Sequence, residues 1–148
     1  MKRIAYAACS MFTLLAALAL FTVGCATIGG LGGGGKAPEG HRYVCNCGHD
    51  CDCGSNAVKP GNCACGKPMV LKKVLVEKGS SYYMCGCPDC TCNALNPNNP
   101  SQCSCGKPLK SFPKKGAYTC ACAGCDCDMQ ANTAAKCPCG VDMKPQQK

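Results

Sequence analysis

The chain has 148 residues, of which 20 are cysteine and 18 are glycine, while aromatic residues make up only 5%. So little apolar bulk excludes a conventional hydrophobic core, because pieces of roughly 30 residues cannot offset a backbone entropy cost of about 1–2 kcal/mol per residue. Disulfide bonds or bound metal must stabilise such pieces. The net charge of +8 comes largely from dispersed lysines, which we expect to be solvated. Without a long basic run, the sequence argues against nucleic acid as a partner.

The N-terminal residues have the pattern of an export signal. Lys2 and Arg3 precede an apolar stretch that ends at Gly24 and Cys25. The residues Thr22-Val23-Gly24-Cys25 resemble a bacterial lipobox. This resemblance implies that residues 1–24 are a lipoprotein signal peptide, and that Cys25 becomes a lipidated N-terminus.

The alternative is an uncleaved transmembrane helix, because residues 4–35 carry no charge and could span a bilayer. Both interpretations place the cysteine-rich part outside the cytoplasm. Ala26 stands where Asp would mark inner-membrane retention in enterobacterial lipoproteins, so the resemblance implies attachment to the outer membrane.

Residues 25–42 are predicted to form a lipidated, glycine-rich tether. After it a pattern of three C-x-C pairs occurs three times and includes all eighteen remaining cysteines. Module 1 (residues 43–72) contains Cys45, Cys47, Cys51, Cys53, Cys63 and Cys65; module 2 (residues 82–110) contains Cys85, Cys87, Cys90, Cys92, Cys103 and Cys105; module 3 (residues 117–146) contains Cys120, Cys122, Cys125, Cys127, Cys137 and Cys139.

Few regular elements are expected around these cysteines. Residues 70–78 alternate and are β-branched enough to form a strand that leads into Tyr82 and Tyr83, and residues 110–118 are a weaker version broken by Pro113. The Asn- and Pro-rich residues 93–102 are typical of a loop. We therefore expect small cysteine-rich, metal-stabilised modules of irregular backbone and short β-strands, with little helix after residue 25.

The C-x-C spacing favours metal binding. In an extended chain, residues i and i+2 project to the same face, so that both sulfurs of a pair can reach one ion. A glycine follows the last cysteine of each module, where a left-handed turn would direct backbone N–H groups at the sulfurs. Six thiolates could close a four-sulfur zinc site with two spare sulfurs, or could all bridge copper(I) ions. The metal is therefore predicted to be zinc or copper(I).

Residues 136–145, Lys-Cys-Pro-Cys-Gly-Val-Asp-Met-Lys-Pro, together with Tyr118-Thr119-Cys120, resemble the small heavy-metal-binding domain of copper and silver efflux components. This resemblance implies a β-rich metal-binding unit in the cell envelope, with metal efflux components as possible partners. The knuckle is one residue shorter than in that family, and no Met or His ligand is carried over. His49, Met69 and Met143 are interpreted as surface or packing residues, and His41 as part of the tether.

The sequence supports a membrane-anchored lipoprotein that binds soft metal ions for buffering, delivery or resistance. The principal alternative is a structural or adhesion protein with disulfide-stapled repeats and no metal, since six cysteines per module is an even number. An enzyme is not expected, because the sequence has no Ser-His-Asp set, no carboxylate pair and no phosphate loop.

Overall fold

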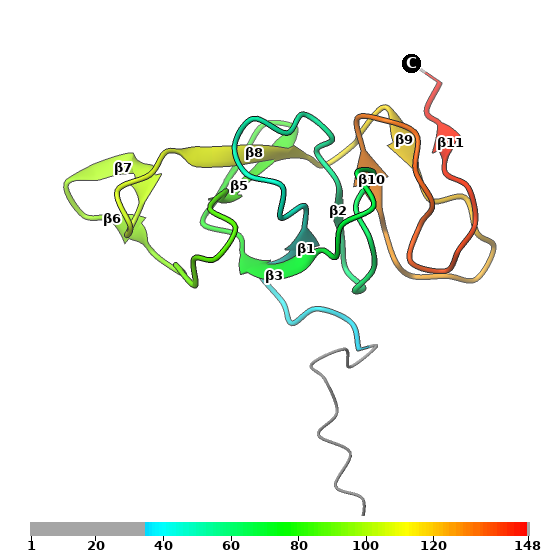
Figure 1. Cartoon of the computed structure of the whole chain (residues 1–148), viewed down its shortest axis with the longest axis horizontal. Coiled ribbons are helices and arrows are strands. Elements are labelled where there is room, and N and C mark those ends of the chain that lie inside the picture. The colour runs from blue at the N-terminus through cyan, green and yellow to red at the C-terminus, as the bar shows by residue number, and fades with distance from the viewer. Residues whose placement is uncertain (1–34, 148) are drawn as a thin grey trace, which may run out of the picture.

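A computed structural model describes residues 35–147 of the chain, and the predicted signal peptide and Cys25 lie outside this range. Within it the fold is built from short strands alone, as Figure 1 shows, with no helix. No helix in this part of the chain is therefore long and apolar enough to cross a membrane. The strands are β1 (His41–Val44), β2 (Asn56–Ala57), β3 (Val70–Lys73), β4 (Val76–Lys78), β5 (Ser81–Cys85), β6 (Leu95–Asn96), β7 (Asn99–Cys103), β8 (Leu109–Pro113), β9 (Tyr118–Thr119), β10 (Gln130–Ala131) and β11 (Lys144–Pro145).

One six-stranded sheet joins modules 1 and 3, in the order β11-β9-β10-β2-β1-β3. In each module the strand before the first cysteine lies between the other two strands, and the two modules meet through β2 and β10. These two strands pair antiparallel, with Asn56 opposite Gln130. Both residues lie three positions after the fourth cysteine of their module. The two halves of the sheet are thus related by an approximate two-fold axis.

Two backbone hydrogen bonds beside this pair follow the same symmetry. The Val58 N–H donates to the Cys127 carbonyl at 2.9 Å, and the Asn132 N–H donates to the Cys53 carbonyl at 2.8 Å. Each bond connects the fourth cysteine of one module to the residue five positions after the fourth cysteine of the other. The junction therefore uses the same residues from both sides.

Module 2 lies at the other end of the molecule in Figure 1, against module 1. Its central strand β5 pairs with β8 and, on its other edge, with β4 from the preceding linker. Residues 93–102, predicted as a loop, contain a short hairpin of β6 and β7. The chain turns at residues 97–98, and Asn96 Oδ1 accepts a 2.9 Å hydrogen bond from the Asn98 N–H, which allows an Asn- and Pro-rich sequence to form strands.

The single strand predicted over residues 70–78 is divided in two. β3 pairs with β1, whereas β4 pairs with β5. The change of partner occurs between Val74, whose N–H donates to the Gly40 carbonyl, and Leu75, whose N–H donates to the Tyr83 carbonyl. The predicted break at Pro113 is confirmed, since β8 ends there. Proline lacks the N–H that a continued ladder would need.

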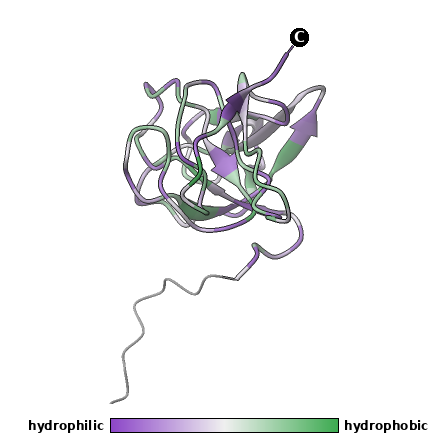
Figure 2. Ribbon diagram, turned by 90° about the vertical axis from the view of Figure 1, so that its right-hand side faces the viewer, coloured by the Kyte–Doolittle hydropathy of each residue, from purple (hydrophilic) through white to green (hydrophobic). Residues whose placement is uncertain are grey.

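The core is small and rich in sulfur. Its largest fully buried side chains are Phe112, Met84, Met129 and Val44, and they pack among buried cysteines. Apolar and polar residues are interleaved along the ribbon in Figure 2. Such a core agrees with the expectation that apolar burial alone supplies little stability.

Arg42 connects the three modules from its place in β1, although it lies within residues 25–42, which were predicted to be a tether. Its side chain is 92% buried. Arg42 Nε donates to Asn56 Oδ1 at 2.7 Å, and Nη2 donates to both the carbonyl and the carboxylate of Asp128 at 2.9 Å. The guanidinium also lies 4.9 Å from the centre of the Tyr82 ring. One cation thus contacts β2, module 3 and β5 of module 2.

Candidate metal centre

The six sulfurs of each module converge on a small volume. In module 1 every sulfur belongs to at least one group of four whose atoms all lie within 4.8 Å of one another, and the same is true of module 2. Such groups could each hold a metal ion. They are Cys45, Cys53, Cys63 and Cys65; Cys45, Cys47, Cys51 and Cys65; Cys85, Cys92, Cys103 and Cys105; Cys85, Cys87, Cys90 and Cys105; and, in module 3, Cys120, Cys122, Cys125 and Cys139.

The sulfur separations approach those of a tetrahedral thiolate site. A zinc–sulfur bond of about 2.3 Å requires about 3.8 Å between the sulfurs of a regular tetrahedron. Cys45 and Cys51 are 3.6 Å apart, Cys87 and Cys105 are 3.7 Å apart, and Cys85 and Cys103 are 3.4 Å apart. Other pairs are closer, with Cys103 and Cys105 at 2.8 Å and Cys122 and Cys139 at 2.7 Å, and their sulfurs would have to separate by about 1 Å to complete such a site.

The C-x-C pairs differ in how they contribute to the groups of four. The sulfurs of the first pair, Cys45 and Cys47, share one group of four, as do those of the third pair, Cys63 and Cys65. The second pair is divided, because Cys51 belongs to one group and Cys53 to the other. Module 2 divides its second pair in the same way. In module 2 the two sulfurs of this pair, on Cys90 and Cys92, still lie 2.7 Å apart, as the same-face argument predicts, although each completes a different group.

The left-handed turn predicted after the last cysteine is present in all three modules. Gly66, Gly106 and Gly140 have φ of 78°, 78° and 82°, a conformation that is costly for residues with a Cβ. In each case the glycine N–H donates at 2.8 Å to the carbonyl of the fifth cysteine of the module. This turn holds the fifth and sixth cysteines side by side at the edge of the sulfur cluster.

Burial differs systematically between these two cysteines. The fifth cysteines, Cys63, Cys103 and Cys137, are buried. The sixth cysteines, Cys65, Cys105 and Cys139, are exposed in every module. Each cluster therefore extends from the interior to the surface.

The pKa values of the thiols are spread widely within each module. The Cys53 N–H lowers the pKa of Cys51 to about 6, and the Cys127 N–H does the same for Cys125. In module 2 a hydrogen bond from Cys103 lowers the pKa of Cys105 to about 6. Burial raises the pKa of Cys45 far above its ordinary value. In the absence of a cation some thiols are therefore ionised at neutral pH while buried neighbours stay protonated, and a cation would allow the others to ionise.

Two lysines expected to be solvated instead hold the loops around the clusters. The Lys72 ammonium, from module 1, donates to the carbonyls of Cys87 and Cys90 in module 2. Lys110, from module 2, donates to the carbonyls of Gly48 and Cys51 in module 1, at 2.5 and 2.7 Å. Each lysine thus brings a positive charge beside the cluster of the other module. No pattern in the sequence indicated this exchange, and only the structure shows that Lys72 is buried while Lys73 is exposed.

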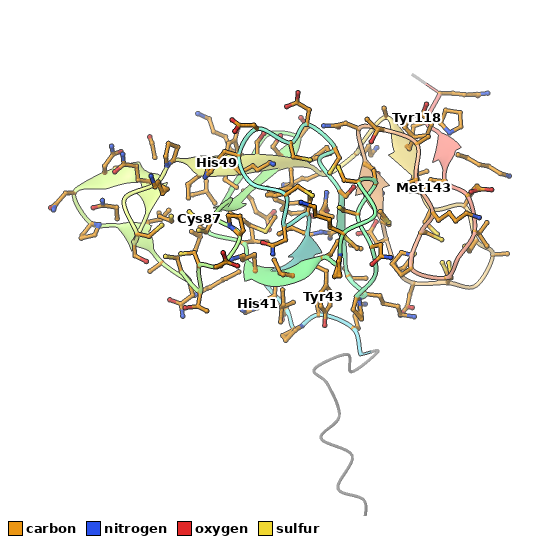
Figure 3. All side chains as sticks on the ribbon, in the orientation of Figure 1. His41, Tyr43, His49, Cys87, Tyr118 and Met143 are labelled. Atoms are coloured by element: carbon orange, nitrogen blue, oxygen red, sulfur yellow. The ribbon has the colours of Figure 1, made fainter. Side chains whose placement is uncertain are left out.

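The other candidate residues stay outside these sulfur groups. Met69 and Met143 are buried in the core, as the packing interpretation predicts. His49 is exposed, and its ring lies beside Gly86, near Cys87 in Figure 3. His41 lies in β1, where its Nδ1 is 3.0 Å from the Glu39 carbonyl oxygen.

All cysteines in residues 35–147 are free thiols in the structure. Comparison of the chain with protein-family models, with curated proteins and with solved structures finds no match. The function must therefore be inferred from the site itself.

Proposed function

We propose that this chain binds soft metal ions through the thiolates of its three modules. The observation that carries the proposal is the convergence of the cysteine sulfurs, four at a time, within 4.8 Å of one another. Thiols rarely gather in this way without a bond or an ion between them, because closely spaced thiolates repel. A bound cation offsets this repulsion and supplies the folding free energy that the small core lacks.

The donor set selects the class of metal. Sulfur-only ligation favours zinc, copper(I) and similar ions over magnesium and calcium, which prefer oxygen ligands. The five groups named above contain only cysteine. Zinc and copper(I) are therefore the ions that we propose.

We further propose that the chain acts in the cell envelope, anchored through lipid on Cys25, where it buffers or delivers metal or contributes to resistance. The lipobox-like Thr22-Val23-Gly24-Cys25 supports the anchor and outer-membrane attachment. The resemblance to a domain of efflux components supports such components as partners. Cys25→Ser should release the protein from the membrane fraction or leave a full-length precursor. Retention in the membrane at unchanged mass would instead favour a transmembrane helix.

Metal analysis combined with thiol counting tests metal binding most directly. The whole chain, purified without oxygen, should contain zinc or copper, and chelation should expose eighteen reactive thiols in the three modules. Amide NMR signals should lose their dispersion on chelation and recover it when metal is restored. A chain that contains no metal, has no reactive thiols and stays equally dispersed would show that disulfides hold the modules.

Acid should reverse metal binding. Protons compete with the metal for thiolates, so stability supplied by the metal is present at neutral pH and is lost as the pH falls. Circular dichroism and metal release, measured together between neutral and acid pH, should change in parallel. Unfolding without metal release, or release without unfolding, would contradict the proposed coupling.

A further inference from the structure

The two groups of four in module 1 are not separate, because they share two sulfurs. Cys45 and Cys65 belong to both groups. Cys53 and Cys63 complete one group, and Cys47 and Cys51 complete the other. Two tetrahedra that have two corners in common share an edge.

Module 2 repeats this arrangement at the corresponding positions. Its shared sulfurs are Cys85 and Cys105, again the first and the sixth cysteines of the module. Cys92 and Cys103 complete one group, while Cys87 and Cys90 complete the other. The strand pairing agrees with this, because the strand before the first cysteine pairs with the strand after the sixth in the same register, with Val44 opposite Val70 in module 1 and Met84 opposite Lys110 in module 2.

Module 3 is consistent with the same plan. Its first, second, third and sixth cysteines form a group of four, as in the other modules. The two cysteines that remain lie beside members of this group. Cys127 is 3.3 Å from Cys125, and Cys137 is 3.3 Å from Cys122.

We infer that each module holds a pair of metal ions bridged by the sulfurs of its first and sixth cysteines. This inference rests on the proposed function and specifies its stoichiometry. Each ion would have two bridging and two terminal thiolates, which satisfies tetrahedral coordination and uses every cysteine. It also explains why the second C-x-C pair is divided, since its sulfurs are terminal ligands of different ions.

The two ions of a module differ in their access to solvent. In module 1 the terminal ligands of one ion, Cys53 and Cys63, are both buried. Those of the other ion, Cys47 and Cys51, are half-buried. The second ion should therefore exchange faster with an external thiol or chelator. This outer ion is the one available for transfer. The inner ion, whose terminal ligands are Cys53 and Cys63, maintains the fold.

Native mass spectrometry of the whole chain titrated anaerobically with Cd(II) tests the inference. Bridged pairs predict a limit of about six ions per chain, or two for each set of six cysteines. Cadmium-113 NMR should show scalar coupling between the two ions of a pair, which requires a shared sulfur. A limit of three ions without coupling would overturn the bridged pair and leave the proposed function intact. Failure to bind any Cd(II) would overturn both.

Substitution of a shared and of a terminal sulfur provides the second test. Cys65→Ser removes a ligand from both ions of module 1, whereas the matched control Cys47→Ser removes one from the outer ion only. Under competition with a chelator, Cys65→Ser should lose two ions from the chain and Cys47→Ser only one. Loss of a single ion with each variant would contradict the sharing.

Cys105→Ser and Cys87→Ser repeat the comparison in module 2, in case a substitution unfolds module 1. The same ratio of losses is expected there. Two ions lost with each of these variants would show that the cluster disassembles as a unit, and would overturn the separate inner and outer ions.

Discussion

Modules 1 and 3 differ from module 2 in how they use the residues between the fourth and fifth cysteines. In module 1 these residues form β2, and in module 3 they form β10, and the two strands pair with each other. In module 2 they form the hairpin of β6 and β7, which closes on itself. The neighbours on this side therefore differ, while the strand before the first cysteine still pairs in the same register with the strand after the sixth, and the sulfur groups occupy corresponding positions.

This difference shows that the segment between the fourth and fifth cysteines can change its strand partners without changing the sulfur groups. The turns at Gly66 and Gly106 have the same φ although one module joins a six-stranded sheet and the other does not. The sheet determines which module contacts which. The cysteine spacing and the repeated pairing of the strands that flank it determine how the sulfurs gather.

The largest effect that we predict comes from removing the third pair of a module. Cys63→Ser together with Cys65→Ser should unfold module 1, because the apparent binding free energy of a structural zinc ion is about 10–16 kcal/mol. Loss of β2 should then expose the Asn132 amide of module 3, which donates to the Cys53 carbonyl. Hydrogen exchange monitored by NMR would detect this.

The matched variant, Cys103→Ser with Cys105→Ser, should unfold module 2 and leave Asn132 protected. Module 2 contributes no strand to the six-stranded sheet. If both double variants expose Asn132 equally, the two regions are not as distinct as the strand pairing indicates.

Arg42→Ala should have the next largest effect. It removes hydrogen bonds to Asn56 and Asp128 and leaves the buried Asn56 Oδ1 without this donor. The free energy of unfolding of the metal-saturated protein should fall by about 2–3 kcal/mol, as measured by urea denaturation. Lys73→Ala, an exposed position on the neighbouring strand, is the control and should change little. A similar loss for both would mean that Arg42 contributes no more than a surface charge.

Lys72 and Lys110 each donate hydrogen bonds to the module to which they do not belong, and substitution of either lysine should affect the module that accepts those bonds. Lys110→Met should weaken metal binding in module 1, and Lys72→Met should weaken it in module 2, each by about 1–2 kcal/mol, or roughly tenfold in affinity. Competition with a chelator, resolved by cadmium-113 NMR, would assign the change to a module. Weakening confined to the lysine's own module would show that these hydrogen bonds do not support the clusters.

The smallest effect is expected in the hairpin of module 2. Asn96→Ala removes the acceptor for the Asn98 N–H, and Asn99→Ala removes the acceptor for the Ser101 N–H. Each should cost about 0.5–1 kcal/mol in local exchange measurements. Protection of Asn132 should not change with either variant, since the hairpin does not contact the junction of modules 1 and 3 through any strand pairing. A change there would reveal coupling along the whole molecule.

The cysteine positions were enough to predict the gathering of sulfurs and the left-handed glycine turns, because both follow from local backbone geometry. The pairing of Asn56 with Gln130 was not predicted, since each belongs to a strand of only two residues and the contact depends on distant parts of the chain. Their equal offset from the fourth cysteine was the available signal. The burial of Arg42 was missed because an isolated arginine beside a glycine-rich stretch gives no local sign of its partners.

The junction between modules 1 and 3 also constrains the order in which the chain folds. Arg42 and Asp128 lie 86 positions apart, whereas Cys85 and Cys103 of module 2 lie only 18 apart. Contacts between distant residues form later, because a longer loop must close and because the second partner is synthesised later. A growing chain can therefore complete module 2 before module 3 has been made. We therefore expect the six-stranded sheet, which needs β9, β10 and β11, to assemble after module 2.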